Sequence, residues 1–312
     1  MLTVVLGLSG ALVYGAADFL GGLASRRLRP VTVAAVASAV GIVPLLVGLL
    51  VVGGRFSASA TLWGAVAGVS GGVGVLLLYR ALAIGPMSVL SPLTAVFAAV
   101  VPVLVAVLRG TTLSGLAVAA LAVAVVAVVL VAAVRDSSGA RVTAVGLVTA
   151  AVAGCGFGGI VLAYDLTPSD SGVAPLVVAR ALQAVLLGVA AVVPRRTGRP
   201  GGAADPATAA DVPGSAVPPG PTARPRRSVR VPRLLLVVVA CGVLDALANV
   251  CVQAALHAGD DPATLPVVSV LNALYPIGTV VLAGIVLRER LTPVQWAGIV
   301  LAFAASVGLA LT

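Results

Sequence analysis

The chain has 312 residues, of which 60% are hydrophobic and only 9% are charged, and its mean hydropathy is +1.19. This composition excludes a water-soluble globular domain, because too few polar residues remain to cover its surface, and it indicates that the lipid bilayer is the solvent. The net charge of +9 does not indicate nucleic-acid binding, since eight of the nineteen basic residues lie in one polar gap between Arg195 and Arg233.

Ten apolar runs follow one another along the chain, and each is long enough to cross a bilayer as a helix of about 20 residues. Continuous apolar runs favour helices over barrel strands, which would alternate polar and apolar residues. We therefore predict an all-α integral membrane protein with ten transmembrane helices. The runs cover residues 2–23, 31–53, 61–84, 87–108, 114–134, 143–164, 173–194, 234–257, 265–287 and 293–311.

The one sizeable hydrophilic segment, residues 195–232, is rich in proline, glycine and arginine and cannot build a core. We expect it to be a disordered loop and a tolerated linker, rather than a regulatory tail. The three cysteines, Cys155, Cys241 and Cys251, fall inside predicted spans without histidine or carboxylate at metal-ligand spacing. This pattern indicates small buried thiols and no metal site.

An internal repeat divides the chain into two halves. A shift of 174 residues aligns identical residues, including two prolines that lie ten positions apart and follow a glycine in both halves. We predict two five-helix repeats, residues 1–134 and 143–312, joined by a loop at 135–142. Because five is odd, the second repeat enters the membrane from the opposite side, an inverted arrangement found in many secondary transporters. The matched residues are Ala81, Leu82, Gly85, Pro92, Val96, Ala99 and Pro102 in the first half and Ala255, Leu256, Gly259, Pro266, Val270, Ala273 and Pro276 in the second.

Two of the runs contain pairs of prolines. Pro92 and Pro102 lie in the fourth run, and Pro266 and Pro276 lie in the ninth. Each proline removes a backbone donor, so we expect both helices to kink. Transmembrane helices often carry prolines without a functional reason, but the recurrence in both halves favours a pair of flexible helices beside the substrate.

Three segments resemble a known family. They are Tyr79–Pro86 (YRALAIGP), Ser91–Leu93 (SPL) and, after the ninth run, Arg288–Thr292 (RERLT). These segments are similar to those of the ten-helix EamA-type proteins of the drug/metabolite transporter superfamily, and the resemblance covers essentially the whole chain. It implies a polytopic carrier for small metabolites or drugs, with a central cavity between two five-helix halves. The segment Arg109–Ser114 lacks the acidic residue of the family pattern, so no role of that acid transfers to the first half.

Ionisable side chains inside spans are costly and are therefore the first candidates for function. Asp18 and Arg80 lie at similar depths, because the first and third spans run in the same direction and end soon afterwards. Asp245 in the eighth span and Arg180 in the seventh share a second level on the other side of the midplane. We predict two charge pairs that close alternately over a central cavity, with static ion pairs as the alternative.

The eighth span carries a polar side chain at every fourth position, namely Asp245, Asn249, Gln253 and His257. This spacing places them on one helix face and predicts a polar stripe. His257 lies at the helix end, where a solvated side chain is a simpler interpretation than a proton relay. Tyr14 and Tyr275 are candidates for contacts with a cationic or aromatic substrate, with ordinary packing as the alternative.

The distribution of arginine bears on orientation. Arginines gather in the loops after odd-numbered runs, whereas those after even-numbered runs hold Arg55 and Arg109. The positive-inside rule then places the odd loops in the cytoplasm and both termini outside. The family resemblance implies the opposite, so the orientation stays open.

The sequence contains no nucleotide-binding loop, metal cluster or soluble catalytic domain. We therefore expect a secondary active transporter of the cytoplasmic membrane that moves a small-molecule substrate by alternating access, without a cofactor. Protons are a candidate coupling ion, and export is slightly favoured over uptake. A membrane-embedded enzyme and a non-transporting receptor or structural protein are the alternatives, but neither requires two mirror-related halves. The substrate and the oligomeric state stay open.

Overall fold

The computed structural model describes residues 1–84, 87–132, 143–192, 231–259, 261–286 and 292–310, and every regular element in these ranges is helical. The predicted connector at 135–142 and almost all of the 195–232 loop lie outside the described residues. The predicted first repeat contains α1 (Leu2–Ser25), α2 (Pro30–Val52), α3 (Ala58–Ile84), α4 (Met87–Leu108) and α5 (Gly115–Ala132). The second holds α6 (Ala144–Asp165), the short 3-10 helix η1 (Ser169–Ser171), α7 (Ala174–Val192), α8 (Val231–His257), α9 (Thr264–Asn272), α10 (Tyr275–Val286) and α11 (Pro293–Ala310).

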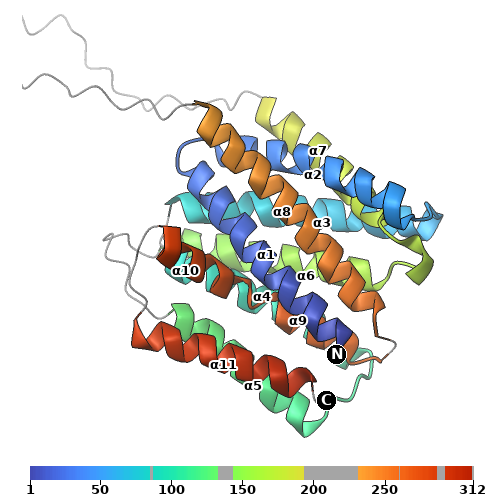
Figure 1. Ribbon diagram of the computed structural model, residues 1–312, viewed down its shortest axis with the longest axis vertical. Coiled ribbons are helices and arrows are strands. Elements are labelled where there is room, and N and C mark those ends of the chain that lie inside the picture. Colours follow the sequence, from blue (N-terminus) through green and yellow to red (C-terminus); the bar gives the residue numbers. More distant parts are fainter. Residues whose placement is uncertain (85–86, 133–142, 193–230, 260, 287–291, 311–312) are drawn as a thin grey trace, which may run out of the picture.

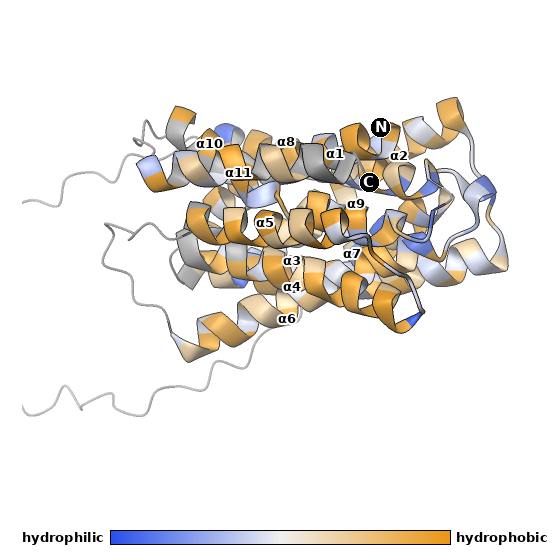
Figure 2. Cartoon of the chain, turned by 90° about the horizontal axis from the view of Figure 1, so that it is seen from below, coloured by the Kyte–Doolittle hydropathy of each residue, from blue (hydrophilic) through white to orange (hydrophobic). Residues whose placement is uncertain are grey.

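The helices carry the apolar surfaces that a bilayer requires. Among the described residues, six helices, α1, α2, α3, α6, α7 and α8, are long and apolar enough to cross a membrane by themselves. Shorter apolar stretches cover Leu93–Leu108, Gly115–Ala127 and Thr264–Thr279. Hydrophobic residues line the bundle along its length, and hydrophilic ones gather near helix ends (Figure 2). The chain is a multi-pass, all-α membrane protein whose exposed aliphatic side chains face lipid.

Capping residues set several helix boundaries. Thr143 Oγ1 accepts a hydrogen bond from the Gly146 amide at 3.1 Å, which begins α6. The hydroxyls of Ser57 and Ser114 accept bonds from the amides three residues onward, at 3.0 Å each, and so begin α3 and α5. α2 ends at Gly53, whose φ of +84° lies in the left-handed region that favours glycine.

The ninth predicted span is not one continuous helix. α9 ends at Asn272 and α10 begins at Tyr275, so the regular α-helix is interrupted by a turn at Ala273 and Leu274. Pro276 has no N–H to donate to the Asn272 carbonyl four residues earlier, which accounts for a break at this point. Pro266 lies in the first turn of α9, where its missing donor has no helical partner to lose.

The fourth span behaves differently from the ninth. α4 runs as one helix through both Pro92 and Pro102, so neither proline interrupts it. Pro102 is fully buried, and the neighbouring α6 approaches its ring at Gly158. The matching prolines Pro102 and Pro276 therefore differ in effect, and the break belongs to the second half.

The most extensive helix contacts join the two repeats rather than neighbours within one repeat (Figure 1). α1 packs along α8 as α6 packs along α3, and α9 with α10 packs on α1 as α4 packs on α6. α2 packs on its counterpart α7, and α5 packs on its counterpart α11. This pattern is preserved when each helix is exchanged with the corresponding helix of the other repeat. The two halves thus form one interlocked bundle.

Glycines at corresponding positions permit two of these close packings. Gly68 of α3 and Gly242 of α8 are 174 residues apart, the offset of the sequence repeat. A Cβ on Gly68 would lie 2.8 Å from the Ala179 carbonyl of α7, and one on Gly242 would overlap the Ala37 carbonyl of α2. Only a residue without a side chain lets these helices approach so closely. The packing of α3 on α7 and of α8 on α2 therefore repeats in atomic detail.

Candidate functional site

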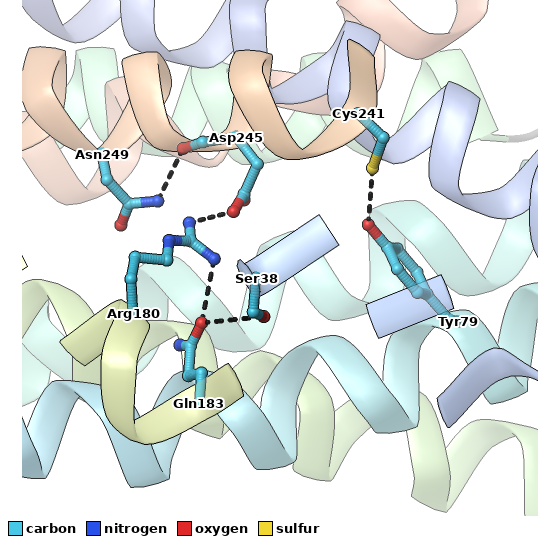
Figure 3. A network of polar contacts seen from close by, with 7 residues as sticks. All are labelled: Ser38, Tyr79, Arg180, Gln183, Cys241, Asp245 and Asn249. Carbon is cyan, nitrogen blue, oxygen red and sulfur yellow. Dashed lines mark hydrogen bonds and ion pairs between the residues drawn. The ribbon is translucent and has the colours of Figure 1, made fainter. Parts of the chain in front are cut away.

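A buried ion pair connects α7 and α8, near the middle of α8. The guanidinium of Arg180 pairs with the carboxylate of Asp245, and the two residues are only 4% and 8% exposed (Figure 3). Arg180 Nη1 also donates a hydrogen bond of 2.9 Å to Gln183 Oε1, one turn along the same helix. Ser38 Oγ of α2 donates to that same oxygen at 3.5 Å. A charge this deep is tolerated because it is both paired and hydrogen-bonded.

Small residues of the first repeat make room for this cluster. Gly71 of α3 corresponds by the repeat offset to Asp245, and a Cβ there would overlap Gln183 Nε2. Gly41 of α2 faces Arg180, whose Cδ would lie 3.7 Å from an added Cβ. The second repeat therefore supplies the charged side chains, and the first supplies the space for them. The site is asymmetric although the packing around it is not.

A small cavity lies beside this cluster, on the side of α1. It offers about 20 Å³ to the centre of a water-sized molecule, which is room for about one or two waters. Residues from α1, α4, α6 and α8 and from both sides of the α9–α10 break line it: Tyr14, Asp18, Ala98, Phe157, Ile160, Val161, Val252, Asn272 and Tyr275. The predicted candidates Tyr14, Asp18 and Tyr275 thus share one cavity.

Asp18 is 6% exposed, and among the described residues no side chain lies within ion-pair or hydrogen-bond distance of its carboxylate. Arg80 is exposed, whereas its neighbour Tyr79 is 3% exposed and faces the interior. The expected Asp18–Arg80 pair is therefore not formed. Two residues at similar depth can pair only if the helix faces that carry them point toward each other. Arg80 lies on a face of α3 that points outward.

The polar stripe of α8 divides its side chains among different partners. Asn249 Nδ2 donates to the Asp245 backbone carbonyl at 2.8 Å, so it stabilises its own helix. Gln253 Nε2 lies 3.5 Å from Thr167 Oγ1, and His257 Nε2 lies 3.2 Å from the same hydroxyl. Asp245 belongs to the central cluster, whereas Gln253 and His257 fasten α8 to the segment between α6 and α7.

Two ion pairs at one end of the bundle are not evident from sequence. Arg55, after α2, pairs with Asp170 of η1 at 3.0 Å, and Arg109, after α4, pairs with Asp165 of α6 at 3.5 Å. Each pair joins the first repeat to the second. The backbone supports the same closure, since Arg55 N donates to the Ser171 carbonyl at 3.2 Å. The sequence did hold a signal for these pairs. The basic residues Arg55 and Arg109 follow helices of the first half, and the acidic residues Asp165 and Asp170 lie at the end of α6 and in η1 of the second half.

Asn272 is another cavity residue that sequence reasoning missed. It is 8% exposed, and its side-chain oxygen Oδ1 has no hydrogen-bond partner. The sequence did hold a signal for it. Asn272 stands four residues before Pro276, and that proline has no N–H to donate to the backbone carbonyl of Asn272.

The comparisons with known proteins agree with this architecture. The model of the EamA-like transporter family matches residues 1–133 and 215–311. A solved structure titled "Crystal structure of protein" is similar with a TM-score of 0.68 and 16% sequence identity, over 99% of this chain and 96% of that one. That likeness concerns the fold. No curated protein matches the chain. Since the family model covers most of the sequence, the chain belongs to the EamA-like transporter family, whose members are membrane transporters of small molecules and not enzymes.

Proposed function

We propose that this protein is a secondary active transporter that moves a small metabolite or drug across the cytoplasmic membrane by alternating access. The observation that carries the proposal is a small cavity lined by the buried Asp18, together with the buried Arg180–Asp245 pair near it, in a chain of a transporter family. Charged groups are retained inside a membrane chiefly where they meet a substrate, an ion or each other.

The two five-helix halves, residues 1–134 and 143–312, are proposed to have inverted topology. The exchange pattern of the helix contacts supports this proposal, since α1 with α8 mirrors α6 with α3. Two corresponding halves around one site have two equivalent ways to rock, one opening to each side. The cavity has room for only about one or two waters, which supports a conformation that is closed around its centre.

The end of the bundle at Arg55 and Arg109 is proposed to open and close during transport. Its two ion pairs link the repeats and are 26% to 80% exposed at their side chains, so each stabilises closure by only about 0–1 kcal/mol. Such weak contacts suit a gate that must open repeatedly. In place of two buried gating pairs, we propose one buried pair, Arg180–Asp245, and an unpaired Asp18 that meets substrate or protons.

Export is proposed as the favoured direction, with the loops after odd-numbered helices in the cytoplasm. The arginine distribution supports this orientation. Both proposals are independent of the site, because an inverted pair of repeats can work in either direction.

Flux into vesicles tests the function. Purified protein is reconstituted and offered amino acids, nucleobases, sugars and organic cations, with and without a pH gradient. We expect saturable flux of at least one class, and at least a tenfold loss in the Asp245→Leu variant, because Arg180 is then left without its counter-charge. The Arg80→Ala variant is the matched control, since that side chain is exposed outside the site. Flux no faster than in protein-free vesicles for all four classes would contradict the proposal.

A further inference from the structure

The cavity beside Asp18 presents hydrogen-bond acceptors that have no donor. The Asp18 carboxylate lines it and meets no cationic or hydrogen-bonding side chain among the described residues. Asn272 also lines it, and its Oδ1 has no hydrogen-bond partner although the residue is only 8% exposed. Buried acceptors are almost always satisfied in folded proteins, so two in one cavity indicate a missing donor.

The break between α9 and α10 adds partial negative charge beside the same cavity. Asn272 is the last residue of α9, and the carbonyls at a helix C-terminus carry partial negative charge. Its own carbonyl lacks the helical donor that Pro276 cannot supply. Broken transmembrane helices use such ends to hold cations.

The charge balance selects the ligand. Asp18 lines the cavity, whereas the Asp245 carboxylate of the neighbouring cluster is already paired with the Arg180 guanidinium. Asp18, when ionised, therefore contributes one negative charge that no cation balances in the described part of the chain. A monocation neutralises it, whereas a zwitterion leaves it uncompensated and an anion adds to it.

The size and the walls of the cavity agree with an ammonium group. Its volume of about 20 Å³ matches a water-sized group, which is the size of –NH₃⁺. The rings of Tyr14, Phe157 and Tyr275 line it, and aromatic faces attract ammonium cations. The rest of a substrate would extend from the cavity once the bundle opens.

We propose that Asp18 and Asn272 bind the ammonium group of an organic monocation, which names the substrate class of the transporter proposed above and rests on that function. Asp18 supplies the counter-charge, and Asn272 accepts a hydrogen bond through Oδ1. The Arg180–Asp245 pair stays intact and does not bind a carboxylate of the substrate.

Four probes that share a phenyl ring test this site by equilibrium binding to the purified full chain. They are phenethylammonium, phenylalanine, phenylacetate and phenylethanol, which carry a positive, zwitterionic, negative and neutral head group. We expect phenethylammonium to bind at least tenfold more tightly than the other three. The Asp18→Asn variant should weaken it at least tenfold and Asn272→Leu severalfold, whereas Arg80→Ala should not change it.

Several results would overturn the proposal. They are equal or tighter binding of phenylalanine or phenylacetate, an unchanged affinity for phenethylammonium in a folded Asp18→Asn protein, no binding of phenethylammonium at about 10 mM, which is roughly ten times the upper end of common KM values, or displacement by sodium chloride alone. The comparison of probes on the unaltered protein decides the question even if Asp18→Asn does not fold. Binding without flux would contradict the proposed function alone, and flux of anions or neutral solutes without cation binding would contradict this proposal alone.

Discussion

The stability of the buried Arg180–Asp245 pair gives a sharp prediction. Both residues are less than a tenth exposed, so replacing Asp245 by leucine leaves an uncompensated guanidinium inside the bundle. We expect the free energy of unfolding to fall by about 3–5 kcal/mol. The Arg180→Met variant leaves the carboxylate alone and also removes the 2.9 Å bond to Gln183, so we expect a similar loss.

The double variant Arg180→Met, Asp245→Leu should regain most of this stability. It removes both charges, and a well-packed apolar pair of similar size is often as stable as a buried ion pair. A residual loss of about 1 kcal/mol is expected, because Gln183 keeps only the long 3.5 Å contact with Ser38. The coupling energy of the two sites, which is the sum of the two single losses minus the loss in the double variant, is therefore at least about 5 kcal/mol.

Unfolding titrations in mixed micelles measure these energies, and flux assays follow on the same proteins. The exposed pair Arg55–Asp170 is the control, and the Arg55→Ala variant should lose at most about 1 kcal/mol. Single variants within 1 kcal/mol of the unaltered protein would refute the reasoning about burial. A stable double variant with normal flux would show that the pair is a static element, whereas at least a tenfold loss of flux supports a working pair.

Three further predictions concern packing, protons and orientation. The Gly242→Ala variant should lose about 1–3 kcal/mol of stability, because the added Cβ would overlap the Ala37 carbonyl. The control Gly188→Ala should be neutral or slightly stabilising, since nothing lies within 4 Å of a Cβ there. Equal melting temperatures of the two variants would contradict this reasoning. If protons drive transport through Asp18, the flux of the Asp18→Asn variant should no longer respond to a pH gradient, and an unaltered response would exclude that coupling. A reporter fused after Thr312 should be active outside the cytoplasm, and cytoplasmic activity would reverse the orientation.

Much of the fold follows from one-dimensional patterns. The apolar runs predict the helices because a bilayer leaves few alternatives for an unbroken hydrophobic segment. Prolines and glycines at a constant offset reveal the repeat, since these residue types are tied to backbone geometry rather than to general hydrophobicity. Depth along the chain was also enough to bring Arg180 and Asp245 to one level, where the structure joins them.

The remaining features depend on helix rotation and on contacts between halves. Asp18 and Arg80 match in depth, but Arg80 points outward, as does its repeat counterpart Ala254, so comparing the helix faces of the two repeats would have separated them. The packing of α1 along α8 rather than within its own half has no local signal, because apolar helices of one composition can pack in many orders. The break before Pro276 has no counterpart in α4, although the matching Pro102 occupies the same place in the repeat, so proline alone does not predict it.

The measurement that tests alternating access most directly is a reversible cross-link across the closed end. Cysteines are introduced as Arg55→Cys and Asp170→Cys, whose native side chains meet at 3.0 Å, in a protein that lacks its three native cysteines. A short, reductively cleavable thiol cross-linker then ties the two repeats together. The account predicts that cross-linking abolishes substrate flux and that cleavage restores it. Undiminished flux through fully cross-linked protein would contradict it.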